Sequence, residues 1–152
     1  ARGDGILEGV NFNSPSQTVV AGDKDAIARF MDVAKEKKIR AKELPVGTAF
    51  HSPMMIPAAD KLKTVLKEAG LKAPNAKIYA NVTAEDMMKD FDGKDAGEYL
   101  ADIMSRQAKS PVYWEETVHH FKRDGAEILI EIGPGKTLSG LAKKSGSGSE
   151  AL

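Results

Sequence analysis

The sequence contains no cysteine, so disulfide bonds, thiolate catalysis and cysteine-ligated zinc sites are all excluded. It has no excess of charge of either sign, because 22 lysine and arginine residues balance 22 aspartate and glutamate residues. Without a net field, the protein has no general attraction for nucleic acid or for a membrane surface. No apolar stretch approaches the roughly eighteen residues of a transmembrane helix, and no charged-then-apolar leader opens the chain. These absences predict a cytoplasmic protein with neither nucleic acid nor membrane as a partner.

The residues that are present have the proportions of an ordinary globular protein, with 41% hydrophobic and 29% charged residues. At 152 residues the chain is long enough for one domain, or for a large piece of a bigger one. Both ends look cut rather than finished. The chain opens without an initiator methionine, and residues 145–152 form a Gly/Ser-rich stretch that predicts a flexible tail.

Hydrophobic periodicity and turn residues predict strands that alternate with helices. Two short strands joined by a turn at 13–16 are expected within residues 6–22, and Asp23 is expected to begin the helix that follows. The further strands are expected at 39–46, 76–83 and 126–132, and the further helices at 57–70, 96–108, 112–123 and within 133–144. Strands that alternate with helices in this way are typical of the α/β class.

Three of these elements carry expectations about burial. The helix over 57–70 is expected to turn four apolar residues inward, namely Leu62, Val65, Leu66 and Ala69. Gln107 falls on the apolar stripe of the helix over 96–108, which places a polar amide on an inward face. The strand over 126–132 has apolar residues on both faces, as expected of a covered parallel sheet.

Residues 133–137, with the sequence GPGKT, invite comparison with a phosphate-binding loop. The Walker pattern requires a glycine five positions before the Gly-Lys pair, and that position is Ile130. The pattern therefore fails, and we interpret the segment as a tight turn between a strand and a helix.

His119 and His120 are the only adjacent histidines in the chain. On a helix their side chains point about 100° apart, so they cannot chelate one ion together. We interpret them as solvated or packing residues, and no metal site is predicted.

The third histidine, His51, lies in AFHSPMM (49–55), among mostly apolar neighbours. An imidazole there could be a packed core residue, a metal ligand or a general base. A base in acyl transfer needs a nucleophile, and the G-x-S-x-G serine turn is missing from this chain. His51 is therefore either structural or one half of a catalytic pair whose partner lies on sequence that is not here.

Four segments in a fixed order resemble one family when they are taken together. They are VNFNSPSQTVVAG (10–22), AFHSPMM (49–55), RQAKSPVYW (106–114) and EIGPGKTLSGLAKK (131–144). This series resembles the malonyl-CoA:acyl carrier protein transacylases of fatty-acid synthesis and, in looser form, the acyltransferase domains of polyketide synthases. The resemblance runs from about residue 6 to 144 and covers only the C-terminal half of that family. The missing half would contain the serine elbow, the oxyanion-hole residues and the arginine that pairs with the malonyl carboxylate.

The fold that this resemblance implies is an α/β-hydrolase-like large subdomain with a small ferredoxin-like subdomain inserted in it. Residues 1–46 would be a partial small subdomain, and residues 47–144 the C-terminal part of the large subdomain. Residues 145–152 would be the flexible tail. A cut at this place would leave sheet edges and apolar faces exposed, so a companion segment with the serine elbow is expected as a partner.

The resemblance also implies residue roles. His51 would be the catalytic base, oriented by the main-chain carbonyl of Gln107 instead of an aspartate, which would account for a polar residue on an inward helical face. Phe50 precedes the histidine, and a bulky aromatic residue there resembles the malonyl-selective pattern, because its ring fills the space that an α-methyl group would need. Gln17 and Asn13 would line the acyl pocket.

The basic run KEKKIRAK, residues 35–42, has two interpretations. It is either a solvated helix end followed by a strand, or a contact for the phosphates of coenzyme A or for an acidic carrier protein. Arg40 and Lys42 are the better candidates for such a contact, because they would share one strand face. Malonyl-CoA would be a substrate and the acyl carrier protein a partner, so no cofactor is expected.

Two alternatives differ in kind from this enzyme hypothesis. The chain could be a truncated or engineered fragment without turnover that acts only as a structural or interaction piece. It could also be a piece of a polyketide-type acyltransferase.

Overall fold

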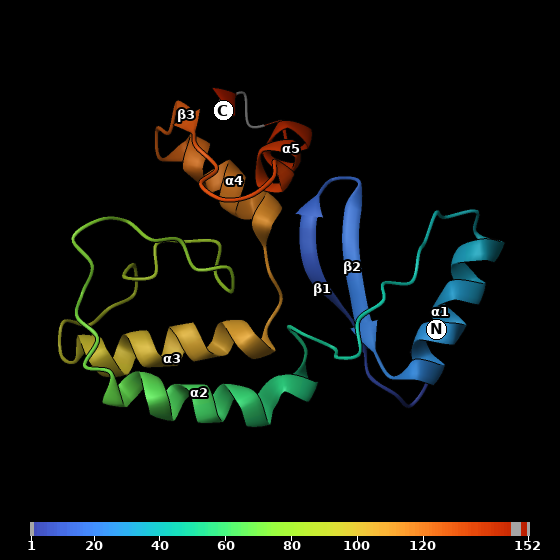
Figure 1. Ribbon diagram of the computed structural model, residues 1–152, viewed down its shortest axis with the longest axis horizontal. Helices are drawn as coiled ribbons and strands as arrows, with labels where there is room; N and C mark the ends of the chain where they lie inside the picture. Colours follow the sequence, from blue (N-terminus) through green and yellow to red (C-terminus); the bar gives the residue numbers. More distant parts are fainter. Residues whose placement is uncertain (1, 147–149, 152) are drawn as a thin grey trace.

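The computed structural model describes residues 2–146 and the backbone of residues 150 and 151. The elements are β1 Leu7–Ser14, β2 Gln17–Gly22, α1 Lys24–Glu36, the 3-10 turn η1 Pro53–Met55, α2 Ile56–Glu68, α3 Ala96–Lys109, α4 Trp114–Arg123, β3 Ile128–Leu129, α5 Thr137–Lys144 and β4 Glu150–Ala151. Figure 1 shows three groups: the β1–β2 hairpin with α1 beside it, the pair α2 and α3, and the pair α4 and α5. None of the helices in the described part is long and apolar enough to cross a membrane.

The hairpin confirms the two strands predicted within residues 6–22. β1 and β2 pair antiparallel, and their register ends at the Ser14–Gln17 pair on either side of the turn. Asp23 stands at the N-cap of α1 as predicted, but its carboxylate accepts the N–H of Ile6 at 2.7 Å instead of capping the helix. This bond ties the entry of the hairpin to the start of α1.

Residues 39–46 do not form the predicted strand and are irregular. Ile39, Leu44 and Val46 are 58%, 48% and 61% exposed, and none of the described strands pairs with them. A strand is stable only when its backbone groups find a partner, and apolar side chains alone do not supply one. Arg40 and Lys42 therefore do not share a strand face, although both are exposed.

α2 and α3 run antiparallel side by side (Figure 1) and are joined by ion pairs between Lys63 and Asp102 and between Lys67 and Glu98. The side of α2 that faces α3 therefore follows the i, i+4 series from Ala59, which is 1% exposed. The predicted inward face is wrong for most of its members. Leu62 and Val65 are 39% and 55% exposed, Ala69 is exposed, and only Leu66 is half-buried. An apolar stripe of α2 next to its contact with α3 is thus left without a cover among the described elements.

The long connection between α2 and α3 contains the predicted strand at 76–83 only as a single bridge between Tyr79 and Asp86. The chain turns back instead, and Ala84 has a left-handed φ of 55° within this turn. The turn packs on α3, where Ala80 and Met87 form a buried cluster with residues of the helix. Local turn formation and burial on α3 thus override the strand propensity of this segment.

The C-terminal strand is shorter than predicted. Only Ile128 and Leu129 of the expected strand at 126–132 pair, in parallel, with β4. Ile130 and Ile132 are 70% and 95% exposed. The parallel sheet covered on both faces is therefore not formed by the described residues, because none of their strands or helices covers the side that carries Ile130 and Ile132.

The predicted fourth helix begins at Trp114 rather than at 112, and it buries Thr117 and Val118 while Trp114 stays half-buried. In the predicted tail, Ser145 is buried and its hydroxyl donates to the Leu141 carbonyl at 3.1 Å. Residues 147–149 and 152 lie outside the described residues. The flexible tail and the subdomain boundaries at 46/47 and 144/145 stay predictions.

Candidate active site

The histidine loop enters α2 through the short turn η1, and Ser52 fixes this entry. Its hydroxyl donates to the Ala49 carbonyl at 2.6 Å and accepts the N–H of Met54 at 3.3 Å, which caps the turn. Pro53 occupies the first position of the turn, where an N–H would have no partner in any case. Because Ser52 is fully buried, the residue before it is held on a rigid support.

His51 itself has a left-handed backbone, with φ of 59°. For a residue other than glycine this conformation costs roughly 1–2 kcal/mol. Such strain persists only where the surrounding structure enforces it, and it gathers at functional sites. The half-buried His51 is therefore a stronger candidate for a functional group than for a packing residue.

The ring of His51 is oriented by the C-terminal end of α3. Its Nδ1 lies 2.8 Å from the main-chain carbonyl oxygen of Gln107. Gln107 belongs to the last turn of the helix, where carbonyl groups have no partner within the helix and carry the negative end of the helix dipole. This carbonyl accepts a hydrogen bond from the ring and presents a negative partial charge to it. An aspartate makes the same two contributions in a catalytic triad.

The other ring nitrogen, Nε2, has no hydrogen-bond partner in the described part of the chain. No carboxylate there forms an ion pair with His51, and the described residues contain no group of three side chains able to hold a metal ion. With Nδ1–H donated to Gln107, Nε2 is the nitrogen that carries the free lone pair. The arrangement is therefore that of a general base that faces away from its orienting group.

The side chain of Gln107 has a separate partner that the sequence did not indicate. Its Oε1 accepts the N–H of Asn81 at 3.0 Å. The polar residue on the apolar stripe of α3 is thus explained by a bond of its amide, and not by the carbonyl that contacts His51. Asn81 lies in the turn predicted as a strand, so no sequence signal placed it near the histidine loop.

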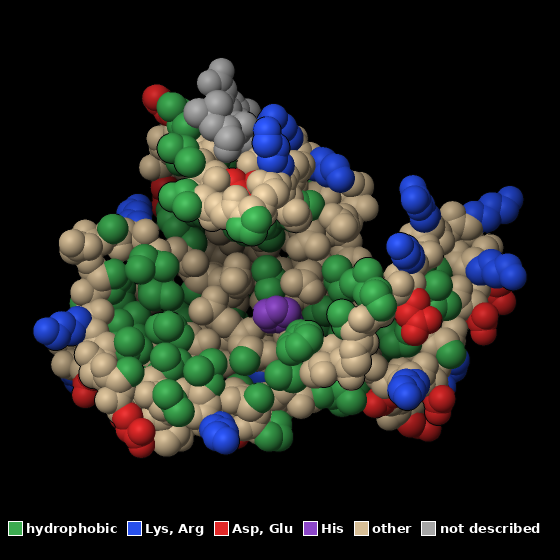
Figure 2. Space-filling model, viewed as in Figure 1, with side chains coloured by type: hydrophobic (Ala, Val, Ile, Leu, Met, Phe, Trp, Pro, Cys, Tyr) green, Lys and Arg blue, Asp and Glu red, His purple; other side chains and the backbone are tan. Residues whose placement is uncertain are grey.

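Phe50 is 53% exposed and Met54 is 45% exposed on either side of the His51–Ser52 pair. Figure 2 shows hydrophobic side chains gathered in the centre of the face that it draws and over the α2–α3 pair. The ring of Phe50 is therefore open to a ligand next to the base. Met54 was not among the predicted site residues, although it follows the histidine at a distance of three residues.

The remaining predicted pocket residues lie on the hairpin. Asn13 is half-buried near the end of β1, and Gln17 is exposed at the start of β2. Neither side chain is hydrogen-bonded to the histidine loop in the part of the chain that is described. Arg40 and Lys42 lie in the irregular segment that leads into that loop. The structure thus brings His51 and Gln107 into contact, with Phe50 adjacent in the chain, and none of the other four predicted residues is bonded to them in the described part of the chain.

The GPGKT segment precedes α5, whose N-terminus is already occupied by a carboxylate. Glu131 accepts the N–H groups of Leu138 and Ser139 at 3.1 and 2.9 Å, and it also accepts the Ser139 hydroxyl at 2.7 Å. The bond from the Ser139 N–H, with the others, lowers the pKa of Glu131. A phosphate would have to displace this side chain, which agrees with the failure of the Walker pattern.

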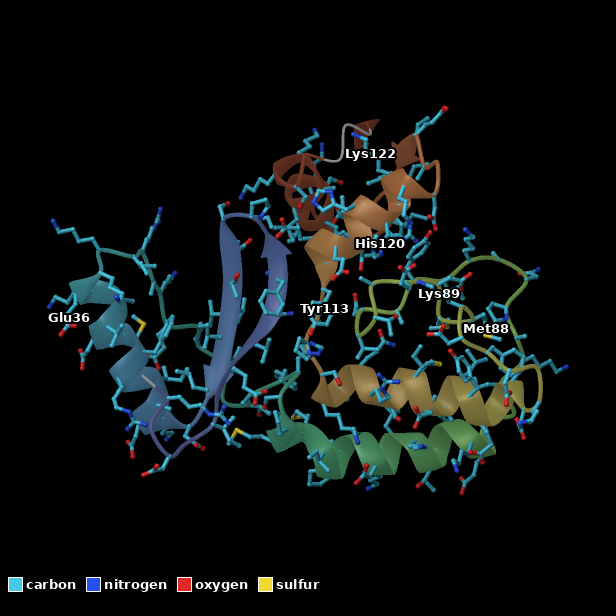
Figure 3. All side chains as sticks on the ribbon, turned by 180° about the vertical axis from the view of Figure 1, so that it is seen from behind. Glu36, Met88, Lys89, Tyr113, His120 and Lys122 are labelled. Atoms are coloured by element: carbon cyan, nitrogen blue, oxygen red, sulfur yellow. The ribbon has the colours of Figure 1, made fainter. Side chains whose placement is uncertain are left out.

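His120 belongs to a cluster of hydrogen bonds and ion pairs that joins α4 to the 80–86 turn. Its Nδ1 lies 2.7 Å from the Ala84 carbonyl, and Figure 3 shows it on α4 facing the segment that carries Lys89. The bidentate Arg123 guanidinium, with Lys89, lowers the pKa of Glu85 to about 2. His119 is exposed. The two histidines therefore have different surroundings, and the prediction that they do not chelate one ion together agrees with this geometry.

Comparison with known proteins shows which family this chain matches. The sequence profile of the acyl transferase domain family matches residues 2–149. A malonyl CoA-acyl carrier protein transacylase of Escherichia coli K12 is 38% identical over 140 residues, which are 91% of this chain and 43% of that protein. The chain thus spans less than half the length of this curated relative.

Solved structures agree. A malonyl CoA-acyl carrier protein transacylase from Clostridium perfringens superposes with a TM-score of 0.87 at 34% identity. The superposed part is 97% of this chain and 45% of the Clostridium chain. A malonyl-transacylase in complex with its type II PKS acyl-carrier protein has a TM-score of 0.85 at 37% identity, over 98% of this chain and 46% of its own. The predicted α/β acyltransferase fold is confirmed by these likenesses.

Proposed function

This chain belongs to the acyl transferase domain family, and we propose that it supplies the histidine-bearing part of a malonyl-CoA:acyl carrier protein transacylase. The observation that carries the proposal is the 2.8 Å contact between His51 Nδ1 and the Gln107 carbonyl. A histidine oriented in this way has a base at Nε2 and no nucleophile of its own. The activity of the whole protein therefore requires a serine from a preceding segment.

In the proposed first half-reaction, Nε2 of His51 takes the proton of the serine hydroxyl while the serine oxygen attacks the malonyl thioester carbonyl. The tetrahedral intermediate collapses, the carbon–sulfur bond breaks, and the proton passes from His51 to the leaving thiol of coenzyme A. In the second half-reaction the same nitrogen takes the proton of the phosphopantetheine thiol of the carrier protein. That thiolate attacks the malonyl-serine ester, and the serine oxygen regains the proton.

A main-chain group is proposed to stabilise the positive charge that His51 carries between these steps. The C-terminal carbonyl of α3 stabilises the imidazolium through one hydrogen bond and through the negative end of the helix dipole. Coenzyme A enters as part of the substrate, and no cofactor takes part in either step.

Phe50 is proposed to face the carbon that carries the malonyl carboxylate, because it is exposed and directly precedes the base. Asn13 and Gln17 are proposed to line the same pocket from the hairpin. Arg40 and Lys42 are exposed in the irregular segment that precedes the histidine loop in the chain, and they are proposed to meet the phosphates of coenzyme A or an acidic carrier protein. The carrier-bound malonyl-transacylase is the relative that lends support to the second partner.

The proposed companion is the serine-bearing N-terminal half of the fold. Two apolar surfaces support it: the stripe of α2 with Leu62 and Val65, and the exposed run with Ile130 and Ile132. Apolar side chains uncovered in this way mark an interaction surface. The share of 43% that the chain covers of its relative leaves enough polypeptide to bury them. A cytoplasmic location and a role in fatty-acid biosynthesis belong to the same proposal, and the malonyl transfer to acyl carrier protein named for the bacterial relatives supports the biosynthetic role.

Reconstitution separates this proposal from an inactive structural fragment and from a polyketide-type piece. The chain is mixed with a separately expressed N-terminal half that carries the serine, and malonyl transfer from malonyl-CoA to an acyl carrier protein is measured. We expect transfer only when both pieces are present, with activity that saturates at one chain per partner. If the two pieces form a complex without transfer, the fragment hypothesis is favoured. A preference for methylmalonyl-CoA would favour the polyketide alternative.

A further inference from the structure

We propose that the side chain of Gln107 is a positioning group that holds His51 in the tautomer with the proton on Nδ1. The inference rests on the proposed function in so far as it gives that tautomer a purpose. Gln107 uses two acceptors at once: its carbonyl oxygen faces His51 Nδ1 at 2.8 Å, and its amide Oε1 accepts the N–H of Asn81 at 3.0 Å. One residue thus orients the ring and is itself anchored.

The anchor matters because of where Gln107 lies in α3. It is the third residue from the end of the helix, and its carbonyl has no partner within the helix. Last turns fray, and the direction of such a carbonyl changes with small changes of the backbone dihedral angles. The helix ends at Ser110, whose backbone is extended, so the turn receives no capping bond at this point. The Lys109–Asp60 ion pair and the two bonds of Val112 with β1 hold the chain around this turn, and the Oε1–Asn81 bond is the restraint on Gln107 itself.

The group that provides the anchor is rigid. Asn81 lies in a turn closed by bonds from the Ala84 N–H to the Ala80 carbonyl at 2.8 Å and from the Ala80 N–H to the Glu85 carbonyl at 2.9 Å. Ala80 and Ala84 are both fully buried. The carbonyl of Asn81 accepts the N–H of Tyr113 at 3.0 Å, which attaches the turn to the connection that leads into α4 (Figure 3).

The consequence for chemistry lies in the tautomer. A neutral imidazole that donates from Nδ1 presents an unprotonated Nε2, and only that nitrogen is able to take a proton from a nucleophile on the open side. If the carbonyl of Gln107 turns away, Nδ1–H loses its acceptor and the proton is free to move to Nε2. The amide side chain, which is bonded to Asn81 and not to the ring, would thereby control the fraction of base that is ready to react.

The test uses this chain as it is and needs no acyl transfer. The variants are Gln107→Met, which keeps length and helix propensity but removes the acceptor, and Gln107→Glu, which keeps an acceptor oxygen. Arg106→Met is the matched control, because it introduces the same residue one position earlier, where the side chain is exposed and contacts neither His51 nor Asn81. The readouts are the ring nitrogen shifts of His51 by long-range ¹H–¹⁵N NMR in alkaline solution, where imidazole is neutral, and the exchange rate of the Asn81 amide.

We expect His51 of the wild type, of Gln107→Glu and of Arg106→Met to carry its proton mainly on Nδ1. In Gln107→Met the ratio of the two tautomers should shift toward Nε2–H by about two- to tenfold, the size of one neutral hydrogen bond. Exchange of the Asn81 amide should quicken in that variant alone. His119 and His120 serve as internal references.

Two results would overturn the proposal. One is faster exchange at Asn81 in Gln107→Met with an unchanged tautomer ratio, which would make the amide bond purely structural. The other is a wild-type ring with its proton mainly on Nε2. If Gln107→Met fails to fold, Gln107→Asn gives the same comparison, because its shorter amide does not reach Asn81. A failure of the malonyl-transfer proposal would instead leave the NMR result intact and remove activity from the reconstituted enzyme, so the two failures are distinguishable.

Discussion

Replacement of His51 by alanine is expected to lower malonyl transfer by roughly 10²–10⁴-fold in the reconstituted enzyme, which is the usual loss when a general base is removed. The reason is that Nε2 has no substitute: the described residues place no second base at this loop, and the carbonyl of Gln107 accepts a hydrogen bond from the ring but cannot take a proton from a nucleophile. The fold should survive, because the half-buried ring contributes one hydrogen bond, while the loop is held by Ser52 and η1.

His119→Ala is the matched control for this measurement, since it removes an imidazole that is exposed on α4. Turnover of this variant should stay near that of the wild type, and circular dichroism should be the same for both variants. A His51→Ala enzyme that keeps near wild-type turnover would mean that the imidazole only packs in the loop.

Replacement of Phe50 by serine is expected to narrow the preference for malonyl-CoA over methylmalonyl-CoA in kcat/KM, chiefly because the branched substrate is admitted. One methyl group in an apolar pocket is worth roughly 1–3 kcal/mol, or about 10–200-fold in discrimination. The ring is 53% exposed one residue before the base, so its removal opens space without leaving a core cavity. The measurement is a competition between the two thioesters.

Phe50→Tyr provides the control for substrate choice, because it keeps the ring and should keep the preference. If both activities of Phe50→Ser fall together at an unchanged ratio, the ring supports the loop and does not select the acyl group. The preference for malonyl would then rest on family membership alone.

The local elements of this fold could be predicted because their causes are local. The turn formers at 13–16 produce the β1–β2 hairpin, and the periodic apolar residues produce the four longer helices. The strands at 39–46 and 126–132 could not be predicted correctly from the same information. A strand depends on partners elsewhere in the fold. No described strand pairs with residues 39–46, and only Ile128 and Leu129 of residues 126–132 pair, with β4, so Val46 and Ile132 remain exposed.

The candidate site also has one part that the sequence predicted and one part that it did not. The pair of His51 and Gln107 followed from the resemblance carried by the four motifs, and the 2.8 Å contact agrees with it. The bond from the Asn81 N–H to the Gln107 amide could not be predicted, because it depends on a turn at 80–84. The β-branched residues Val82 and Thr83 in this turn are typical of a strand, which is why a strand was predicted there. The predicted strand face shared by Arg40 and Lys42 failed for lack of a partner strand, although their exposure leaves the proposed contact with phosphates or carrier protein open to test.

The most direct test of the central claim asks where the malonyl group becomes attached, and at what rate, in a single turnover. Malonyl-CoA is mixed rapidly with the chain, with the serine-bearing N-terminal half, and with both together, and each polypeptide is weighed by intact mass spectrometry after quenching. We predict a malonyl adduct on the N-terminal half that forms rapidly only in the presence of this chain with His51 intact, and no adduct on this chain in any mixture. A malonyl adduct on this chain, or one that forms equally fast on the N-terminal half alone, would contradict the claim that His51 activates a serine from the other segment.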